Sequence, residues 1–326
     1  MSRLTRRALL GGAAATAAIA AGGLGWQAWP GRQAPQRVTT LRADAYDLGL
    51  VEVISAGLRR WPALLARLRG ARVLLKTNLV EHHPDRPINT HPWVVAATVE
   101  ALLQLGAAQV QVGDAPGHRR DGEALLVGSG LDALLEQVGA EFVDLNYDAF
   151  HRLPLVDDLS GLSSLPVAAA VLEADLVFSL AKLKTHHWAG VTLSMKNLFG
   201  ALPGAELGWP KNRLHWAGIE KVTVDLWRSL APDFAIVDGV VGMEGDGPIM
   251  GTPVASGFIA MGDHLPAVDA HCARLMGIVP ERLPTLRLAR AHGGTIAASR
   301  IVTEGDGIAP RDFALLPRWG WARRVG

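Results

Sequence analysis

The chain has 326 residues, 49% hydrophobic and 19% charged, with a formal net charge of +1 and one cysteine. This composition excludes a disordered chain, and the length fits two average domains or one large α/β domain. The lone Cys272 excludes an internal disulfide, a cysteine-rich zinc site and an iron–sulfur cluster held by the chain's own cysteines, while a charge of −2 outside the first 30 residues excludes the basic surface of a nucleic-acid-binding protein.

Residues 1–30 are typical of an export signal. Arg6 and Arg7 directly precede an uncharged stretch, 8–25, that is rich in alanine and glycine. A basic segment before a short, weakly apolar one is typical of secretion signals, and the arginine pair indicates the twin-arginine (Tat) route. We therefore expect a periplasmic or other extracytoplasmic protein that meets the Tat translocase during export. The alternative is an uncleaved anchor, which would be the chain's only attachment to a membrane.

The next segment, 31–45, is polar and contains a proline, and we predict a linker there. Residues 46–326 then form the predicted α/β domain. In its first half, short apolar runs alternate with stretches of helical spacing, a pattern typical of βαβ units. We expect strands at 72–77, 109–113 and 141–145. We expect helices at 92–105 and 122–138.

The second half of the chain continues the same alternation. In residues 151–170 the apolar pattern is short and interrupted by proline, and we expect a hairpin insertion there. The further expected elements are strands at 175–181, 234–238 and 257–261 and helices at 214–230 and 266–276. This order predicts a doubly wound α/β fold with a largely parallel sheet, either as one body or as two lobes that meet near 150–175.

Lysines are unevenly distributed along the chain. There are six lysines against 26 arginines. Five of the six lie within residues 182–221, and Lys76 is the exception. Lysine supplies a compact ammonium whose pKa shifts readily on burial, so a local preference for lysine indicates a functional site. For Lys211 and Lys221, a solvated surface is at least as good an explanation.

A nineteen-residue segment carries the most specific signal. Lys182-Leu-Lys-Thr-His-His-Trp-Ala-Gly-Val-Thr-Leu-Ser-Met-Lys-Asn-Leu-Phe-Gly200 resembles the signature of the domain of unknown function 362 family. The Lys-x-Asn at 76–78, the acidic glycine-rich loop at 238–248 and the helix at 269–278 are similar to its other recurrent segments. The resemblance implies an α/β domain, fused in some members to ferredoxin-type cysteine motifs. Since this chain has no CxxC motif, an iron–sulfur role does not carry over.

Polar side chains follow the predicted strands where each strand ends. In open α/β sheets, ligands bind beyond the carboxyl ends of the strands, so these side chains are candidates for one anion site. Residues 182 and 184 share a face of an extended strand and would point at the same ligand. The candidate catalytic residues are Lys182, Lys184, His186, Lys196 and Asp238. The candidate substrate-binding residues are Lys76, Asn78, Thr185, Asn197, Glu244 and Asp246.

Each of these assignments has a simpler alternative. The lysines would then be solvated charges at strand ends, and the acids of the 238–248 loop would only cap backbone amides. Histidines at three places, His82, His91 and His187, are candidate ligands for a divalent metal. Histidines in loops more often form ordinary hydrogen bonds, so the sequence does not decide whether the protein binds a metal cofactor.

The sequence therefore favours an exported enzyme that acts on a small anionic substrate, carboxylate or phosphate-like, in a Lys/His/Asp cleft. His186 or Asp238 would move the proton. The alternative from another class is a non-catalytic periplasmic protein that binds or carries a metal or an oxyanion. Neither the substrate nor the reaction class follows from the sequence.

Overall fold

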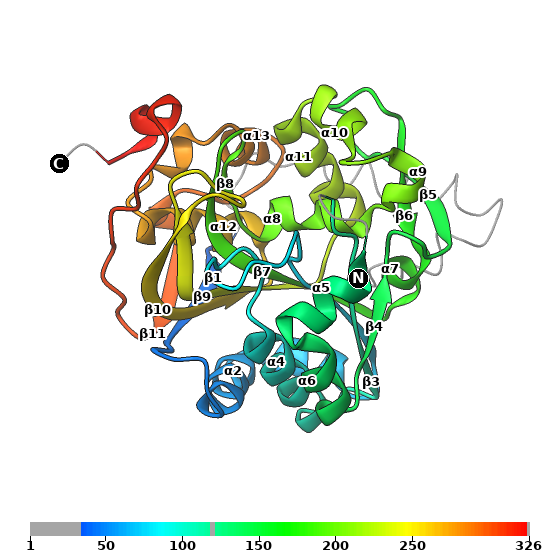
Figure 1. Ribbon diagram of the computed structural model, residues 1–326. Coiled ribbons are helices and arrows are strands. Elements are labelled where there is room, and N and C mark those ends of the chain that lie inside the picture. Colours follow the sequence, from blue (N-terminus) through cyan, green and yellow to red (C-terminus); the bar gives the residue numbers. More distant parts are fainter. Residues whose placement is uncertain (1–33, 118–120, 325–326) are drawn as a thin grey trace.

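The computed structural model describes residues 34–117 and 121–324 (Figure 1). The predicted export signal at 1–30 lies outside these residues. Within them, no helix combines the length and the apolar character needed to cross a membrane.

A nine-stranded sheet forms the centre of the molecule, in the order β11-β1-β10-β9-β7-β2-β3-β4, with β8 paired to β7. The central run β9-β7-β2-β3-β4 is parallel throughout, whereas β10 joins β9 and β1 in antiparallel fashion. The α/β fold with a largely parallel sheet is therefore confirmed. The strands are β1 Gln36–Arg42, β2 Arg72–Lys76, β3 Gln109–Asp114, β4 Glu141–Asp144, β7 Leu176–His186, β8 Gly190–Thr192, β9 Phe234–Glu244, β10 Thr252–Gly262 and β11 Ile301–Gly305.

Helices cover both faces of this sheet, as Figure 1 shows. The lower face in that view carries α2 Gly49–Arg59, α4 Pro92–Gln104 and α6 Leu131–Val138, with α3 Pro62–Leu68 packed on α2 and α5 Gly122–Ser129 on α6. The upper face carries α8 Ser194–Asn197, α10 Asn212–Trp216, α11 Ile219–Leu230, α12 Leu265–Leu275 and α13 Pro284–Ala291. The shorter helices are α7 Ala169–Glu173, α9 Gly204–Leu207 and the 3₁₀ turns Leu198–Ala201, Pro280–Arg282, Ala298–Arg300 and Pro317–Ala322.

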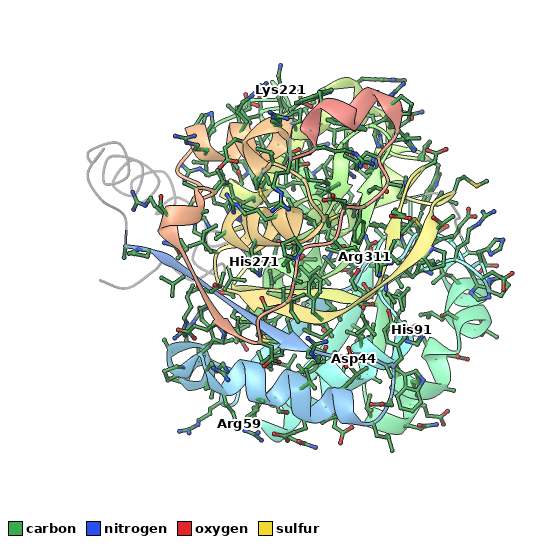
Figure 2. The ribbon with its side chains drawn as sticks, turned by 90° about the vertical axis from the view of Figure 1, so that its left-hand side faces the viewer. Asp44, Arg59, His91, Lys221, His271 and Arg311 are labelled. Carbon is green, nitrogen blue, oxygen red and sulfur yellow. The ribbon has the colours of Figure 1, made fainter. Side chains whose placement is uncertain are left out.

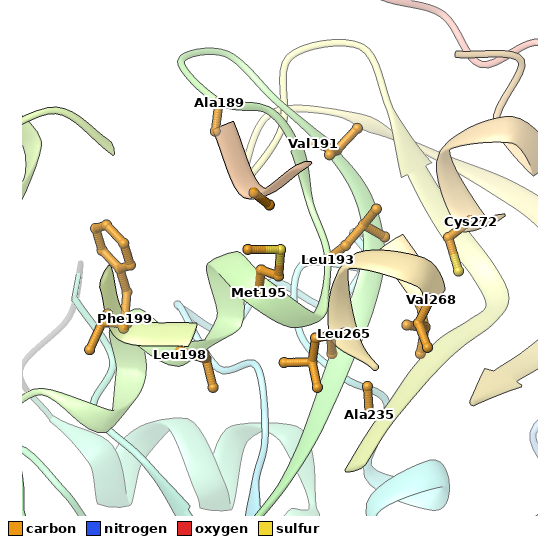
Figure 3. Close-up of a cluster of buried hydrophobic side chains, with 14 of the residues drawn as sticks. Ala189, Val191, Leu193, Met195, Leu198, Phe199, Ala235, Leu265, Val268 and Cys272 are labelled. Carbon is orange, nitrogen blue, oxygen red and sulfur yellow. The ribbon is translucent and has the colours of Figure 1, made fainter. Parts of the chain in front are cut away.

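Each face of the sheet has its own hydrophobic core. Figure 3 shows part of the upper one, where Leu193 and Met195 pack near Leu265 and Val268 of α12. Cys272 lies in the same core, fully buried and unpaired, and burial raises the pKa of its thiol well above the ordinary value. The single cysteine therefore serves packing.

The predicted linker at 31–45 is wrong. Gln36–Arg42 is strand β1, which lies between β10 and β11. Its central residues Val38–Leu41 are buried, and three of these four are β-branched, which suits a pleated, covered surface. Two predicted helices are each divided in two, because Gly130 and Gly218 adopt φ values of 71° and 99° that end a helix.

The predicted hairpin insertion is present as β5 Phe150–Pro154 and β6 Ser164–Ala168, which form a separate two-stranded sheet. The main sheet continues past this insertion, because β7 pairs with β2 on one side and β9 on the other. Residues 150–175 therefore do not interrupt the sheet.

The two central strands are longer than predicted. β7 runs to His186 rather than 181, and all eleven of its residues are buried. Its pairing with β2 ends at Ser179, so the lysine-bearing half of β7 projects beyond the carboxyl end of β2. β9 likewise runs to Glu244, and Asp238 is a buried strand residue instead of part of a loop. Lys182 and Lys184 are consequently interior residues.

Candidate functional site

A buried ion pair joins the ends of β2 and β3. Lys76 Nζ lies 2.7 Å from Asp114 Oδ1, and both side chains are almost wholly buried. The Asp114 carboxylate also accepts from the backbone N–H groups of Leu79 at 2.5 Å and Ala115 at 2.7 Å. Burial lowers the pKa of Lys76 and raises that of Asp114, and the attraction between the two opposes both shifts. Each charge thus has a full set of partners.

Asn197 connects this pair to the neighbouring elements. Its Oδ1 accepts from Lys76 Nζ at 3.2 Å and from Asn78 Nδ2 at 3.1 Å. Its Nδ2 donates to the Lys76 carbonyl and to Ser179 Oγ, each at 3.1 Å. Every hydrogen-bonding group of the Asn197 amide is therefore engaged by the chain, which fixes α8 against β2 and β7. Asn78 Oδ1, in contrast, is buried without a partner among the described residues.

A second buried ion pair lies between β7 and β9. Lys182 Nζ lies 2.7 Å from Asp238 Oδ2 and donates to Tyr46 Oη at 2.9 Å. Tyr46 Oη donates to Asp238 Oδ1 at 3.1 Å and accepts from Val241 N at 3.0 Å, while the backbone N–H of His91 donates to Asp238 Oδ2. Two of the predicted catalytic groups, Lys182 and Asp238, therefore satisfy each other inside the sheet.

Tyr46 completes this network, and the sequence did not single it out. Its ring stacks on that of His91 with centroids 3.6 Å apart, and burial and Asp238 raise the pKa of its hydroxyl. Burial lowers the pKa of His91 to about 4. The hydroxyl is thus a neutral hydrogen-bonding bridge between charged groups.

Removing that hydroxyl tests its role. We expect Tyr46→Phe to lower the free energy of unfolding by about 1–3 kcal/mol, because Lys182, Asp238 and the Val241 amide each lose a buried partner. Denaturant titration measures the change. Tyr147→Phe is the matched control, since Tyr147 is 64% exposed and is the only other tyrosine. Equal stability of the two variants would contradict the bridging role.

Lys184 is buried without an acid. It is fully buried, and its Nζ donates to the Ile88 carbonyl at 2.6 Å. Among the described residues no carboxylate forms an ion pair with it. Burial lowers its pKa well below the ordinary value, and the charges of Lys182 and Lys196 lower it further.

Lys211 is the second lysine of this kind. It is 3% exposed, and its Nζ donates to the carbonyls of Ala115 at 2.8 Å and Phe199 at 3.2 Å. Burial lowers its pKa to about 7, against the opposing effect of Asp114. Its φ of 66° is a strained backbone value for a side chain of this size. Of the two explanations left open for Lys211, the solvated surface is therefore wrong, whereas Lys221 does project from the outside of the molecule (Figure 2).

Lys196 is the third lysine of the group, and it is half-buried where Lys184 and Lys211 are buried. Its Nζ lies 3.6 Å from the centroid of the Phe199 ring, and no hydrogen-bond acceptor or carboxylate engages it in the part of the chain that the structure describes. Burial, followed by repulsion from Lys76, lowers its pKa to about 7. Asp269 of α12 holds the helix that carries it, accepting from Ser194 N at 2.8 Å and Met195 N at 3.0 Å.

Two histidines lie next to these lysines. His186 Nδ1 accepts from the backbone N–H groups of Trp188 at 3.0 Å and Ala189 at 3.2 Å, so its proton is on Nε2. His215 Nδ1 faces the Lys211 carbonyl at 3.1 Å and must donate, which leaves Nε2 as an acceptor. Burial and then Lys196 lower the pKa of both rings, that of His215 to about 4.

These five residues form what we call the lysine–histidine cluster: Lys184, His186, Lys196, Lys211 and His215. Lys196 links the cluster, because its charge lowers the pKa of each of the other four residues. The two buried carboxylates nearby, Asp114 and Asp238, are already paired with Lys76 and Lys182. The cluster therefore holds three amines that form no ion pair with an acid in the part of the chain that the structure describes.

An open hollow adjoins the cluster on the surface. It has a volume of about 640 Å³ and is lined by His187, Trp188, Asp246, Leu316, Pro317 and Arg318. Trp188 is 54% exposed, and its ring meets that of His215 edge-on with centroids 5.3 Å apart. The indole N–H of Trp319 donates to the His187 carbonyl at 2.9 Å and thereby fixes the turn between β7 and β8. Trp188 thus stands between the hollow and the cluster.

The remaining predicted binding residues contact other parts of the chain. Thr185 Oγ1 donates to the Gly245 carbonyl at 2.9 Å, and Glu244 accepts from Ala314 N at 2.8 Å. Asp246 lines the hollow and lies 3.8 Å from His187 Nδ1. Thr185 and Glu244 therefore brace the loops around the site.

The structure places the three predicted metal ligands in different surroundings. His82 is exposed beside Gly128, His91 stacks on Tyr46, and His187 faces Asp246. Across 34–117 and 121–324, no three histidine, cysteine or acidic side chains gather as a metal site would require.

Fold and site together define an α/β protein with a largely buried basic cluster where the parallel strands end. Residues 73–274 match the family described as "Domain of unknown function (DUF362)", and the chain belongs to this family. The resemblance seen in the sequence is thereby confirmed. A thylakoid-associated protein of Synechocystis, sll1697, is 29% identical over 262 residues, which span 76% of this chain and 77% of that protein.

Two solved structures are more distantly similar. A structural-genomics protein from Thermotoga maritima aligns with a TM-score of 0.42 and 15% identity, over 77% of this chain and 60% of its own. The lactate racemase apoprotein from Thermoanaerobacterium thermosaccharolyticum aligns with a TM-score of 0.47 and 14% identity, over 75% of this chain and 57% of its own. The chain thus spans less than two thirds of either structure.

Proposed function

We propose that this protein is an enzyme that acts on a small anionic substrate, carboxylate or phosphate-like, bound by the lysine–histidine cluster. One observation carries the proposal: the buried Lys184 and Lys211 lie around the half-buried Lys196, and no carboxylate of the described residues forms an ion pair with any of the three. Buried charges are normally paired, and an amine buried alone costs stability. An anionic ligand would supply the missing partner.

The residues of the cluster differ in what they offer an anion. Lys184 and Lys211 are already aimed by backbone carbonyls and would contribute charge-assisted hydrogen bonds. His186 carries its proton on Nε2 and would donate it in a hydrogen bond. Lys196, with a pKa of about 7, would move a proton at neutral pH. In this scheme Lys182 and Asp238 position β7 and β9 and do not touch the substrate.

Sulfate binding tests the proposal, because sulfate mimics a phosphate-like group and keeps its charge throughout the neutral range. Calorimetric titration of the full-length protein near pH 6 should show saturable binding, and Lys184→Met should weaken it at least roughly ten-fold, as loss of one buried charge-assisted bond requires. Lys221→Met, on the exposed face of α11, should bind as the parent does. Equal affinity in all three proteins would contradict the proposal.

The same cluster would also suit an oxyanion carrier without catalysis. The two functions differ in the fate of the anion. An enzyme converts its bound ligand, whereas a carrier returns it unchanged. Mass spectrometry of ligand that copurifies with the protein, before and after incubation, distinguishes them.

We further propose that the protein is exported by the Tat route to the periplasm or an equivalent compartment. Arg6 and Arg7 before the weakly apolar stretch 8–25 support this. Replacing both arginines with lysine should leave the protein in the cytoplasm, as measured by cell fractionation. Unchanged export of that variant would rule out the Tat route.

A further inference from the structure

This inference rests on the proposed function and names its substrate class. We propose that the substrate is an anionic aldehyde or ketone, such as a 2-oxo acid, and that Lys196 Nζ attacks its carbonyl carbon to form an imine. The amine's position over Phe199, with no hydrogen-bond acceptor for it among residues 34–117 and 121–324, singles it out.

Lys196 is half-buried, and it differs from the four buried lysines in having no hydrogen-bond acceptor among the described residues. Lys76, Lys182, Lys184 and Lys211 each place Nζ within 2.6–3.2 Å of an oxygen atom of the chain. Those bonds hold the four amines in place and occupy their protons. Lys196 Nζ has no such contact among the described residues. No hydrogen bond to the chain therefore fixes its orientation, and its lone pair can face a ligand.

The surroundings of Lys196 favour the neutral, nucleophilic amine. Reaction at a carbonyl needs an unprotonated amine, which enzymes obtain by burying a lysine or by placing another cation beside it. Lys196 has both in part: it is half-buried, and Lys76 lies close enough to repel its charge, which together outweigh the attraction of the Phe199 ring for an ammonium. The pKa of about 7 agrees with this geometry.

The rest of the cluster accounts for the negative charge of the substrate. Lys184 and Lys211 are fixed by the Ile88 and Ala115 carbonyls, and an anion beside them would favour their protonated form, so they suit a carboxylate or phosphate group rather than attack. A neutral carbonyl compound would leave these amines without a counter-charge. We therefore expect the anionic group and the carbonyl to belong to one molecule.

The step balances without a further reactant. The lone pair of neutral Lys196 forms the C–N bond, and the π pair of the C=O bond moves to oxygen, which takes up a proton. The nitrogen then loses a proton, and the hydroxyl leaves as water once it is protonated. Overall, one amine, one carbonyl group and one proton from solvent yield one protonated imine and one water.

Reductive trapping tests the inference. Full-length protein is incubated at neutral pH with pyruvate and sodium cyanoborohydride, which reduces an imine to a stable secondary amine. Peptide mass spectrometry should find one carboxyethyl group on Lys196, formed at least about ten-fold faster than on exposed Lys221. Only six lysines are present, so each can be followed. Acetone, which lacks the anionic group, should label Lys196 far more slowly.

Variants separate this inference from the proposed function. Lys196→Arg keeps the positive charge but cannot form an imine, so it should bind sulfate and resist labelling; Lys196→Met checks the same loss of labelling with an uncharged side chain. Sulfate should protect Lys196 in the parent protein. If sulfate binds but pyruvate labels no lysine faster than Lys221, the imine is wrong and the proposed function stands. If sulfate does not bind at all, the proposed function fails and the inference fails with it.

Discussion

Replacing Gly200 with alanine should lower the free energy of unfolding by about 3–5 kcal/mol, the usual result of separating a buried ion pair. A Cβ atom at Gly200 would overlap both Asp114 Oδ1 and Lys76 Nζ. Neither charged group can move into water, since both are almost wholly buried. The alanine would therefore break the 2.7 Å contact and leave two unpaired charges inside the sheet.

Denaturant titration measures this loss, and Gly307→Ala is the matched control. A Cβ at Gly307 would meet no atom within 4 Å, so that variant should be close to the parent in stability. Asp114→Asn removes the same ion pair without adding volume and should be destabilised by a similar amount. If Gly200→Ala were as stable as Gly307→Ala, the ion pair would not be the contact that requires a glycine at 200.

Replacing Lys184 with methionine should do the opposite and raise the free energy of unfolding near pH 7 by about 2 kcal/mol. An unpaired buried lysine lowers stability whether it stays charged or releases its proton. Methionine has a similar length and no charge, and the main loss is one hydrogen bond to the Ile88 carbonyl. A gain in stability together with a loss of sulfate binding marks a residue kept for its ligand.

The pH dependence gives this prediction a sign. The pKa of Lys184 is lower in the folded than in the unfolded protein, so the unfolded state binds more protons below the ordinary lysine pKa of 10.5. The parent protein therefore gains stability from this group as the pH rises toward 10.5, and Lys184→Met does not. The advantage of the variant should shrink from pH 7 to about pH 9. A variant less stable than the parent at pH 7 would show that Lys184 is structural.

Much of the fold follows from local patterns in the sequence. The runs at 72–77 and 109–113 became β2 and β3 almost residue for residue, because a buried parallel strand is a continuous apolar run. The same rule underestimates β7, since Lys182 and Lys184 break the apolar run while the strand continues through them. β1 escapes prediction because its pairing partners, β10 and β11, lie more than 200 residues away.

The site was partly predictable, because the predicted strands also indicate where each strand ends. Strand ends located Lys76, Lys184 and His186 at one edge of the sheet. Which lysines are paired depends on register between distant strands: Lys182 stands opposite Asp238, and this leaves Lys184 without an acid. No spacing in the sequence indicates this difference.

Lys211, Tyr46 and His215 show the limit of reasoning from spacing. Lys211 is buried because a strained turn brings it under the Ala115 and Phe199 carbonyls. Tyr46 lies in a short segment before α2 and donates to Asp238, which is 192 residues further along the chain. His215, four residues beyond Lys211 on α10, follows it into the site, and this i, i+4 spacing is the one signal that could have indicated it.

The central claim is that the unpaired lysines of the cluster bind an anion in their protonated form. Its most direct test is the affinity of the full-length protein for sulfate at about pH 6 and about pH 9, with proton uptake measured in two buffers of different ionisation enthalpy. Because the pKa values of Lys196 and Lys211 are about 7, sulfate should bind at least roughly ten-fold more weakly at the higher pH and draw protons onto the protein near pH 8. An affinity that does not change with pH, or binding without proton uptake, would contradict the account.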